Sequence, residues 1–136
     1  MKWSFKIFLF CALVLIIKSK AQSLDTLSYL KQFEVNKANY IGQPFSKLLN
    51  NMIQIQPKTS WSFPFKSQKN KIHSSDFNFC NKNKSYYNAV TLHIIWQTPI
   101  LTSQTKYYEQ LNGFYFTDDE KSFYGSKIIK DIMVYR

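Results

Sequence analysis

The chain opens with an apolar run that differs from everything after it. Residues Ile7–Ile17 are eleven consecutive apolar residues, and they follow two lysines. Ser19 and Ala21 then place small residues at the −3 and −1 positions of a cut after Ala21. A basic start, a short apolar core and a small-residue junction are the three parts of a secretory signal peptide. We therefore predict that residues 1–21 are a cleaved signal peptide, because a membrane span needs about 20 apolar residues.

Removal of that peptide leaves residues 22–136, which we expect to form a single α+β domain in the periplasm or outside the cell. This segment has 115 residues, enough for a domain to bury roughly two thirds of its unfolded surface. It contains no further run long enough to cross a membrane. The alternative to cleavage is that residues 1–21 remain attached as an N-terminal membrane anchor. Cys80 is its one cysteine, which excludes an intramolecular disulfide. We expect a monomer in which Cys80 is a buried thiol, and the alternative is an intermolecular or reactive thiol.

Two helices are predicted at the start of this segment. Leu24, Leu27 and Leu30 recur at three-residue steps, and Ser23 is placed to cap a helix that begins at Leu24. Pro44 suits the first turn of a second helix. The apolar positions of that helix follow the i, i+3, i+4, i+7 pattern of one buried face: Phe45, Leu48, Leu49 and Met52.

The period then changes from helical to alternating. Trp61, Phe63 and Phe65 alternate with polar residues, which predicts a strand with its aromatic rings directed inward. Pro64 lacks an N–H to donate, so this strand is expected at an edge of the sheet.

Two more strands follow, separated by polar turns. Residues 72–80 predict a second strand and residues 88–98 a third, which Pro99 should end. The third strand presents an apolar face and a mixed face, as expected of an interior antiparallel strand packed under helices. The apolar face consists of Val90, Leu92, Ile94 and Trp96.

The C-terminal part mixes both kinds of element. Residues 103–111 favour a helix ended by Gly113, although Asn112-Gly113 also suits a hairpin turn. Thr117 and Glu120 form a capping box for a short helix, and residues 127–135 predict the last strand. The predicted fold class is therefore α+β, with N-terminal helices packed on an antiparallel sheet of about four strands and a short C-terminal helix before the last strand.

The charge of the chain narrows the choice of partner. The net charge is +10 at pH 7 for the whole sequence and +6 without the predicted signal peptide. Arg136 is the only arginine, and the abundance of Lys, Asn and Ile is typical of an AT-rich genome. Proteins that grip phosphate usually recruit arginine for bidentate contacts, so we do not expect nucleic acid as the partner.

Most of the excess charge lies in one aromatic-rich stretch. Residues 58–84 contain six lysines against one acid, Asp76. Such a stretch is suited to a protein or to a polyanion of the cell envelope, although its lysines are also explained as solvated turns around inward aromatic rings. The candidate binding residues are Lys69, Lys71, Lys82, Lys84 and Trp61.

Catalytic chemistry has a weaker basis in the sequence. His73 and His93 are the only histidines, and such a pair can act as acid and base in a nuclease-like hydrolase. With Cys80 they are three possible metal ligands, but their spacing matches no metal motif. The acidic run Asp118–Glu120 is explained by helix capping. We expect no metal and no cofactor.

These observations favour a small exported protein that binds a partner and does not catalyse a reaction. A secreted hydrolase using His73 and His93 is one alternative, and a structural protein of the cell envelope is another.

Overall fold

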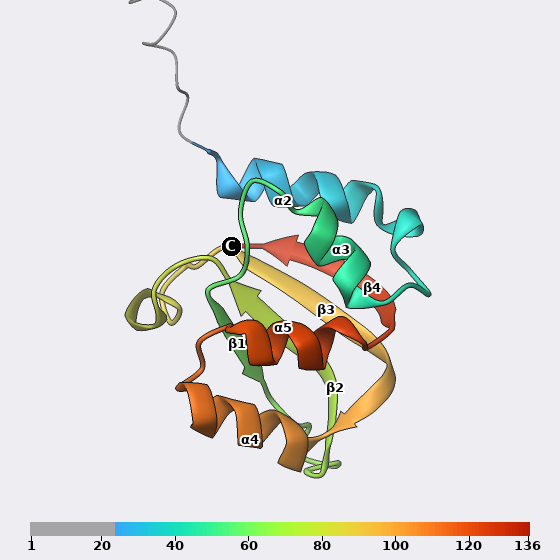
Figure 1. Cartoon of the computed structure of the whole chain (residues 1–136), viewed down its shortest axis with the longest axis vertical. Helices are drawn as coiled ribbons and strands as arrows, with labels where there is room; N and C mark the ends of the chain where they lie inside the picture. The colour runs from blue at the N-terminus through green and yellow to red at the C-terminus, as the bar shows by residue number, and fades with distance from the viewer. Residues whose placement is uncertain (1–23) are drawn as a thin grey trace, which may run out of the picture.

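A computed structural model describes residues 24–136, and the signal peptide predicted for residues 1–21 lies outside this range. The described chain forms four α-helices, two short 3-10 helices and a four-stranded sheet (Figure 1). Along the chain these are α2 (Thr26–Val35), η1 (Lys37–Asn39), α3 (Phe45–Asn51), β1 (Thr59–Ser62), β2 (Lys71–Asn78), η2 (Lys82–Lys84), β3 (Thr91–Leu101), α4 (Thr102–Asn112), α5 (Asp118–Gly125) and β4 (Ile129–Tyr135).

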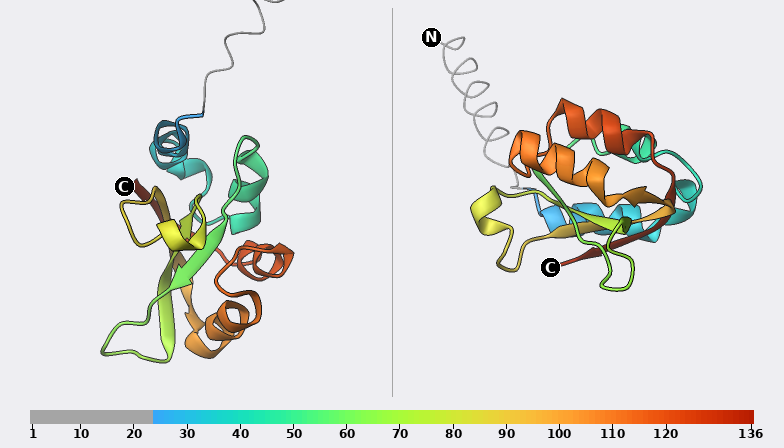
Figure 2. Two further views of the ribbon diagram at one scale, coloured as in Figure 1. Left: turned by 90° about the vertical axis from the view of Figure 1, so that its left-hand side faces the viewer. Right: turned by 90° about the horizontal axis from the view of Figure 1, so that it is seen from below.

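The sheet is antiparallel throughout, with the strand order β1-β2-β3-β4. Helices α3, α4 and α5 lie on one face of the sheet, and α2 runs beside the edge strand β4 (Figures 1 and 2). The α4–α5 pair connects β3 to β4. The predicted α+β class, the N-terminal helices on the sheet and the short helix before the last strand are confirmed.

The core lies between the covered face of the sheet and these helices. The apolar stripe of α3 is buried throughout, from Phe45 to Met52, as its helical spacing predicts. It meets an aromatic cluster in which the Phe77 ring lies 4.8 Å from Phe45 and edge-on to Tyr124 at 5.3 Å. Leu92, Ile94 and Trp96 of β3 complete this core, so the apolar face predicted for the third strand is confirmed.

Helix α2 begins later than the leucine pattern predicts. Its N-cap residue is Asp25, whose side chain accepts hydrogen bonds from the Ser28 backbone N–H at 3.3 Å and from the Ser28 hydroxyl at 2.8 Å. The predicted start at Leu24 with Ser23 as the cap is therefore wrong. A carboxylate two residues further on satisfies the first free N–H groups of the helix.

Strand β1 turns its aromatic residue in the direction opposite to the prediction. Ser60 and Ser62 face the helices, where the Ser62 hydroxyl lies 2.6 Å from that of Ser75, whereas Trp61 lies on the other face beside Asp76. The strand ends at Ser62, so Phe63 and Phe65 are exposed. The prediction of inward rings is wrong because hydrogen-bonded serines occupy the core positions of this edge strand.

Pro99 does not end the third strand. Strand β3 continues to Leu101, with Ile100 paired to Ile72 of β2. Pairing with β4 stops at Trp96, so Pro99 stands on a part of β3 that has no neighbour on the β4 side. A proline is tolerated there because no ladder hydrogen bond needs its missing N–H.

The C-terminal helices follow the sequence signals closely. The residues at 102–112 form helix α4, ended by Gly113 in the left-handed conformation at φ +60°, so the hairpin alternative is excluded. Thr117 and Glu120 form the predicted capping box of α5. None of the helices in the described part of the chain is both long and apolar enough to cross a membrane.

Candidate functional site

The candidate site is built on the segment that joins β2 to β3, residues 79–90. We call this segment the β2–β3 connection. It leaves the sheet on the left in Figure 1 and contains the 3-10 helix η2. Asn88 in this segment has a positive φ of 47°, a left-handed conformation that asparagine tolerates better than most residues. The Ser85 hydroxyl lies 3.2 Å from that of Thr59, which ties the connection to β1. This contact holds the middle of the connection against the first strand of the sheet.

An aromatic cluster centred on Trp61 packs against the connection. Trp61 stacks on Phe114 with ring centroids 4.4 Å apart, and Tyr86 meets Trp61 edge-on at 5.2 Å. The Lys82 ammonium lies over the Phe114 ring, 5.0 Å from its centroid. Such a cation–π contact is attractive and leaves the ammonium available to a second partner. Trp61 itself is only 8% exposed, so it supports the surface and does not form its outer layer.

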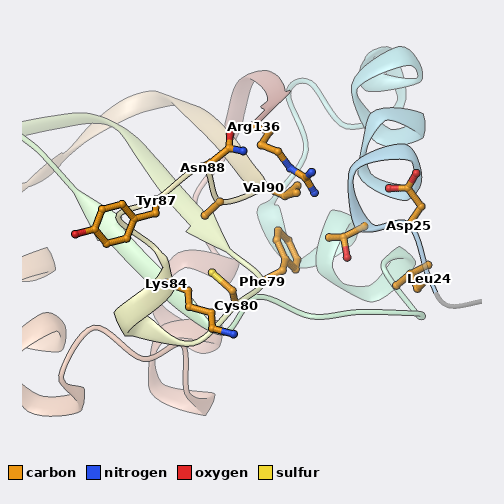
Figure 3. Close-up of a pocket in the computed structure, with 11 residues that line it drawn as sticks. Leu24, Asp25, Phe79, Cys80, Lys84, Tyr87, Asn88, Val90 and Arg136 are labelled. Atoms are coloured by element: carbon orange, nitrogen blue, oxygen red, sulfur yellow. The ribbon is translucent and has the colours of Figure 1, made fainter.

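Three separate hollows in the surface are lined by residues of this connection. The first, of about 380 Å³, includes the apolar side chains of Phe79 and Val90 in its lining (Figure 3). Lys84 and Arg136 approach it from different elements, and Asp25 contributes a carboxylate. The hydrogen bonds from Ser28 hold the pKa of Asp25 below its usual value, so this carboxylate is ionised at neutral pH. Among the side chains that line this hollow, two are cationic, Lys84 and Arg136, and one is acidic, Asp25.

The second hollow carries a single positive charge between two tyrosines. It is lined by Lys82 with two amide side chains and two tyrosine rings, namely Asn81, Asn83, Tyr86 and Tyr115. The third hollow shares Tyr86 with the second and includes Trp61 and Asp76, which lie on the sheet face opposite to that of the core residue Phe77. It contains Asp76 and no lysine or arginine.

The lysines of the connection have no carboxylate partner within residues 24–136. In that range, lysine ion pairs form only between Lys31 and Glu34 and between Lys37 and Asp131, both at 2.7 Å. Lys82 and Lys84 are therefore available for an external anion. This availability is what a binding surface for an anionic partner requires.

The predicted binding residues do not form one patch. Lys82, Lys84 and Trp61 belong to the β2–β3 connection and its support, whereas Lys69 and Lys71 lie in and next to the turn before β2, at the bottom of Figure 1. Strand β2, which begins at Lys71 and has eight residues, runs between the two pairs of lysines, a length of roughly 25 Å at the usual rise of a strand.

The two histidines have different partners. His93 places Nδ1 at 2.5 Å from the Asp76 carboxylate, on the uncovered face of the sheet. His73 places Nε2 at 2.7 Å from the Gln68 side chain and stacks on Phe65. Nothing in the contacts of either ring joins it to the other, so the arrangement lacks the shared acid–base centre that a two-histidine hydrolase requires.

Cys80 does not combine with the histidines into a metal centre. The residue is half-buried and not fully buried as expected, and its sulfur lies 3.8 Å from the Ser85 hydroxyl. Within residues 24–136, no three histidine, cysteine or acidic side chains gather in a way that could hold a metal ion.

Sequence reasoning missed the tyrosines of the site. Tyr86 and Tyr87 are 66% and 80% exposed, and their position directly after the lysines of the basic stretch is a signal that could have identified them. Phe114 and Tyr115 carry no such signal, because the loop between α4 and α5 brings them to β1 from a distant part of the sequence.

The fold and this surface define an α+β domain with a basic, aromatic-rich connection at one end of its sheet. Comparisons with protein-family models, with curated proteins and with solved structures find no match.

Proposed function

We propose that this chain is an exported, non-catalytic binding protein that captures an anionic polymer of the cell envelope on the β2–β3 connection. The observation that carries the proposal is the pair Lys82 and Lys84 on one short helix, without carboxylate partners in the described chain and next to exposed tyrosines. Export enters the proposal through the signal peptide predicted for residues 1–21.

The arrangement suits a polymer better than a compact anion. Lys82 belongs to one hollow and Lys84 to another, and Arg136 adds a third cation on the far side of the hollow that Lys84 lines (Figure 3). A polymer with repeated negative charges can contact these cations one after another. Exposed tyrosine rings add contact area at a low entropic cost, since each ring has few rotatable bonds.

The lack of a shared histidine centre argues against the hydrolase alternative. His93 has an orienting carboxylate in Asp76, which is one part of an acid–base device. The alternative predicts turnover of RNA or DNA that falls by roughly 100-fold or more in His93→Ala. Our proposal predicts no histidine-dependent turnover.

The test compares two pairs of charge reversals. The protein is applied to immobilised heparin, used as a model polyanion, and to neutral dextran of similar chain length. We expect binding to heparin alone, with an affinity that falls as salt rises, because the Debye length shrinks from about 10 Å at 0.1 M to about 3 Å at 1 M. The double variant Lys82→Glu, Lys84→Glu should bind heparin at least about tenfold more weakly at 0.1 M salt.

The double variant Lys69→Glu, Lys71→Glu is the matched control. It makes the same change of charge on exposed residues at the other end of β2. We expect it to retain most of the affinity. Equal losses of affinity in the two double variants would show that heparin binding depends only on the net charge of the protein. This result would contradict a site on the connection.

A further inference from the structure

The hollow on the uncovered face of the sheet is lined by an acidic residue and by no lysine or arginine, whereas the two neighbouring hollows are lined by lysines. Its walls include four aromatic side chains, from β1, the chain just after β1, the connection and the end of β4: Trp61, Phe63, Tyr86 and Tyr135. The remaining lining residues are Asp76 and the neutral polar residues Asn78, Ser85 and Thr91. In a protein with a net charge of +10, this hollow combines aromatic walls with a negative charge.

Two neutral polar residues that line the hollow, Asn78 and Thr91, are hydrogen-bonded to each other. Asp76 is the acidic residue of the lining. The Asn78 amide donates a hydrogen bond of 2.8 Å to the Thr91 hydroxyl, and both residues are buried. Asp76 accepts a hydrogen bond from His93 Nδ1, which fixes the carboxylate in place on the wall of the hollow. Burial, and after it the nearby charge of Asp76, raise the pKa of Tyr135.

Aromatic rings around a carboxylate are the chemistry that recognises organic cations. The face of an aromatic ring attracts a cation through its quadrupole, and cages of such rings bind quaternary ammonium groups. We propose that this hollow binds an alkylammonium group, with Asp76 as its counter-charge and the rings of Tyr86, Phe63 and Tyr135 as its walls. This proposal does not rest on the polyanion function, because it concerns a different hollow and the opposite charge.

The size of the hollow agrees with such a group. Its volume is about 140 Å³, close to the roughly 150 Å³ of a cavity that accommodates benzene in another protein. A trimethylammonium group is smaller than benzene, whereas a sugar ring with its hydroxyls or a peptide segment is larger. The hollow therefore fits the head of a ligand and leaves the rest of that ligand outside.

The test uses a pair of ligands that differ only in charge. Choline and 3,3-dimethylbutan-1-ol have the same shape, with nitrogen in one where the other has carbon. Each is titrated into the purified protein at pH 8 by calorimetry and by NMR, at constant ionic strength. We expect choline to bind and the neutral alcohol to bind at least about tenfold more weakly. Phosphocholine is titrated as well, because tighter binding than choline would identify a phosphorylated source of the same head group.

Two variants and two controls locate the binding site. Asp76→Asn keeps a hydrogen-bond acceptor for His93 but removes the charge, and we expect it to weaken choline binding about tenfold. Asp131→Asn is the control, since Asp131 lies on the same sheet face outside the hollow. Tyr135→Leu removes one wall, and Tyr107→Leu makes the same change at an exposed position on α4.

Binding of choline that is lost in Asp76→Asn and Tyr135→Leu, and retained in both controls, supports the proposal. If Asp76→Asn fails to fold, the comparison of Tyr135→Leu with Tyr107→Leu decides. Equal affinity for choline and the neutral alcohol, absence of choline binding, or equal losses in variants and controls would each overturn it.

Discussion

The carboxylate of Glu34 accepts a hydrogen bond from the backbone N–H of Val134 at 3.0 Å, although the two residues are 100 positions apart. Val134 belongs to β4, an edge strand with unpaired backbone groups on its outer side. On the opposite edge, the Ser62 N–H of β1 donates to the Glu109 carboxylate at 3.1 Å. Side chains thus occupy backbone donors at both edges, which opposes pairing with a second sheet.

Replacement of Glu34 by alanine should expose this dependence. We expect Glu34→Ala to lower the free energy of unfolding by about 1 kcal/mol, because the Val134 N–H loses its partner at a partly buried position. Urea denaturation measures the change. Lys31→Ala is the control, since it removes only the exposed ion pair to Glu34 and should cost less than about 0.5 kcal/mol. Equal costs would show that the ion pair, and not the edge hydrogen bond, is what matters.

Glu109 should make stability depend on pH in a direction opposite to that of most carboxylates. Burial raises the pKa of Glu109 above its ordinary 4.5, so its charged form is less favourable in the folded state than in the unfolded state. Its stabilising effect is complete below pH 4.5 and is lost as the pH rises through the folded-state pKa.

The variant Glu109→Gln keeps an acceptor for the Ser62 N–H and removes this charge. We expect Glu109→Gln to be more stable than the wild type at pH 7 and equal to it below pH 4.5. Denaturation curves at a series of pH values test this. A variant that is less stable than the wild type at pH 7 would contradict the argument.

The capping box of α5 gives a prediction of definite size. Thr117 accepts a hydrogen bond from the Asp119 N–H at 3.2 Å, while Glu120 accepts one from the Thr117 N–H at 2.9 Å. We expect Thr117→Ala to lower the free energy of unfolding by about 0.5–2 kcal/mol and Thr117→Ser to restore most of the loss. Thermal denaturation distinguishes them. Equal stability of the alanine and serine variants would show that the cap does not contribute.

Cys80 should have no role in assembly. Its half-buried thiol has no cysteine partner within residues 24–136. We expect freshly purified protein to run as a monomer on non-reducing gels and Cys80→Ala to change stability only slightly. A dimer that disappears with reductant in the wild type and is absent from Cys80→Ala would assign the thiol an intermolecular role.

The sequence predicts elements whose signals are local. The stripe from Phe45 to Met52 and the cap at Thr117 depend on residues within two turns of a helix, and both are confirmed. The orientation of β1 is not local in this sense. Alternation shows that Trp61 and Ser62 lie on opposite faces, but the hydrogen-bonding partners of Ser62 in the core, Ser75 and Tyr124, come from other elements.

The candidate site was predictable only in the part that depends on residues close together in the sequence. Lys82 and Lys84 are neighbours in the sequence, so their shared surface follows directly. Two turns that flank a strand lie at its opposite ends, so the sequence also contained the signal that separates Lys69 and Lys71 from them. The stacking of Phe114 on Trp61 had no such signal, since it depends on how the α4–α5 loop meets the sheet edge.

The most direct test of the binding surface is a map of backbone amide shifts in the protein labelled with ¹⁵N as a heparin oligosaccharide is added at 0.1 M salt. We predict that the perturbed amides cluster in residues 79–90 and around Tyr115 and Arg136, while residues 66–71 remain unchanged. The same titration at 1 M salt should leave the spectrum unperturbed. Perturbations centred on residues 66–71, or spread evenly over all exposed lysines, would contradict a binding surface on the β2–β3 connection.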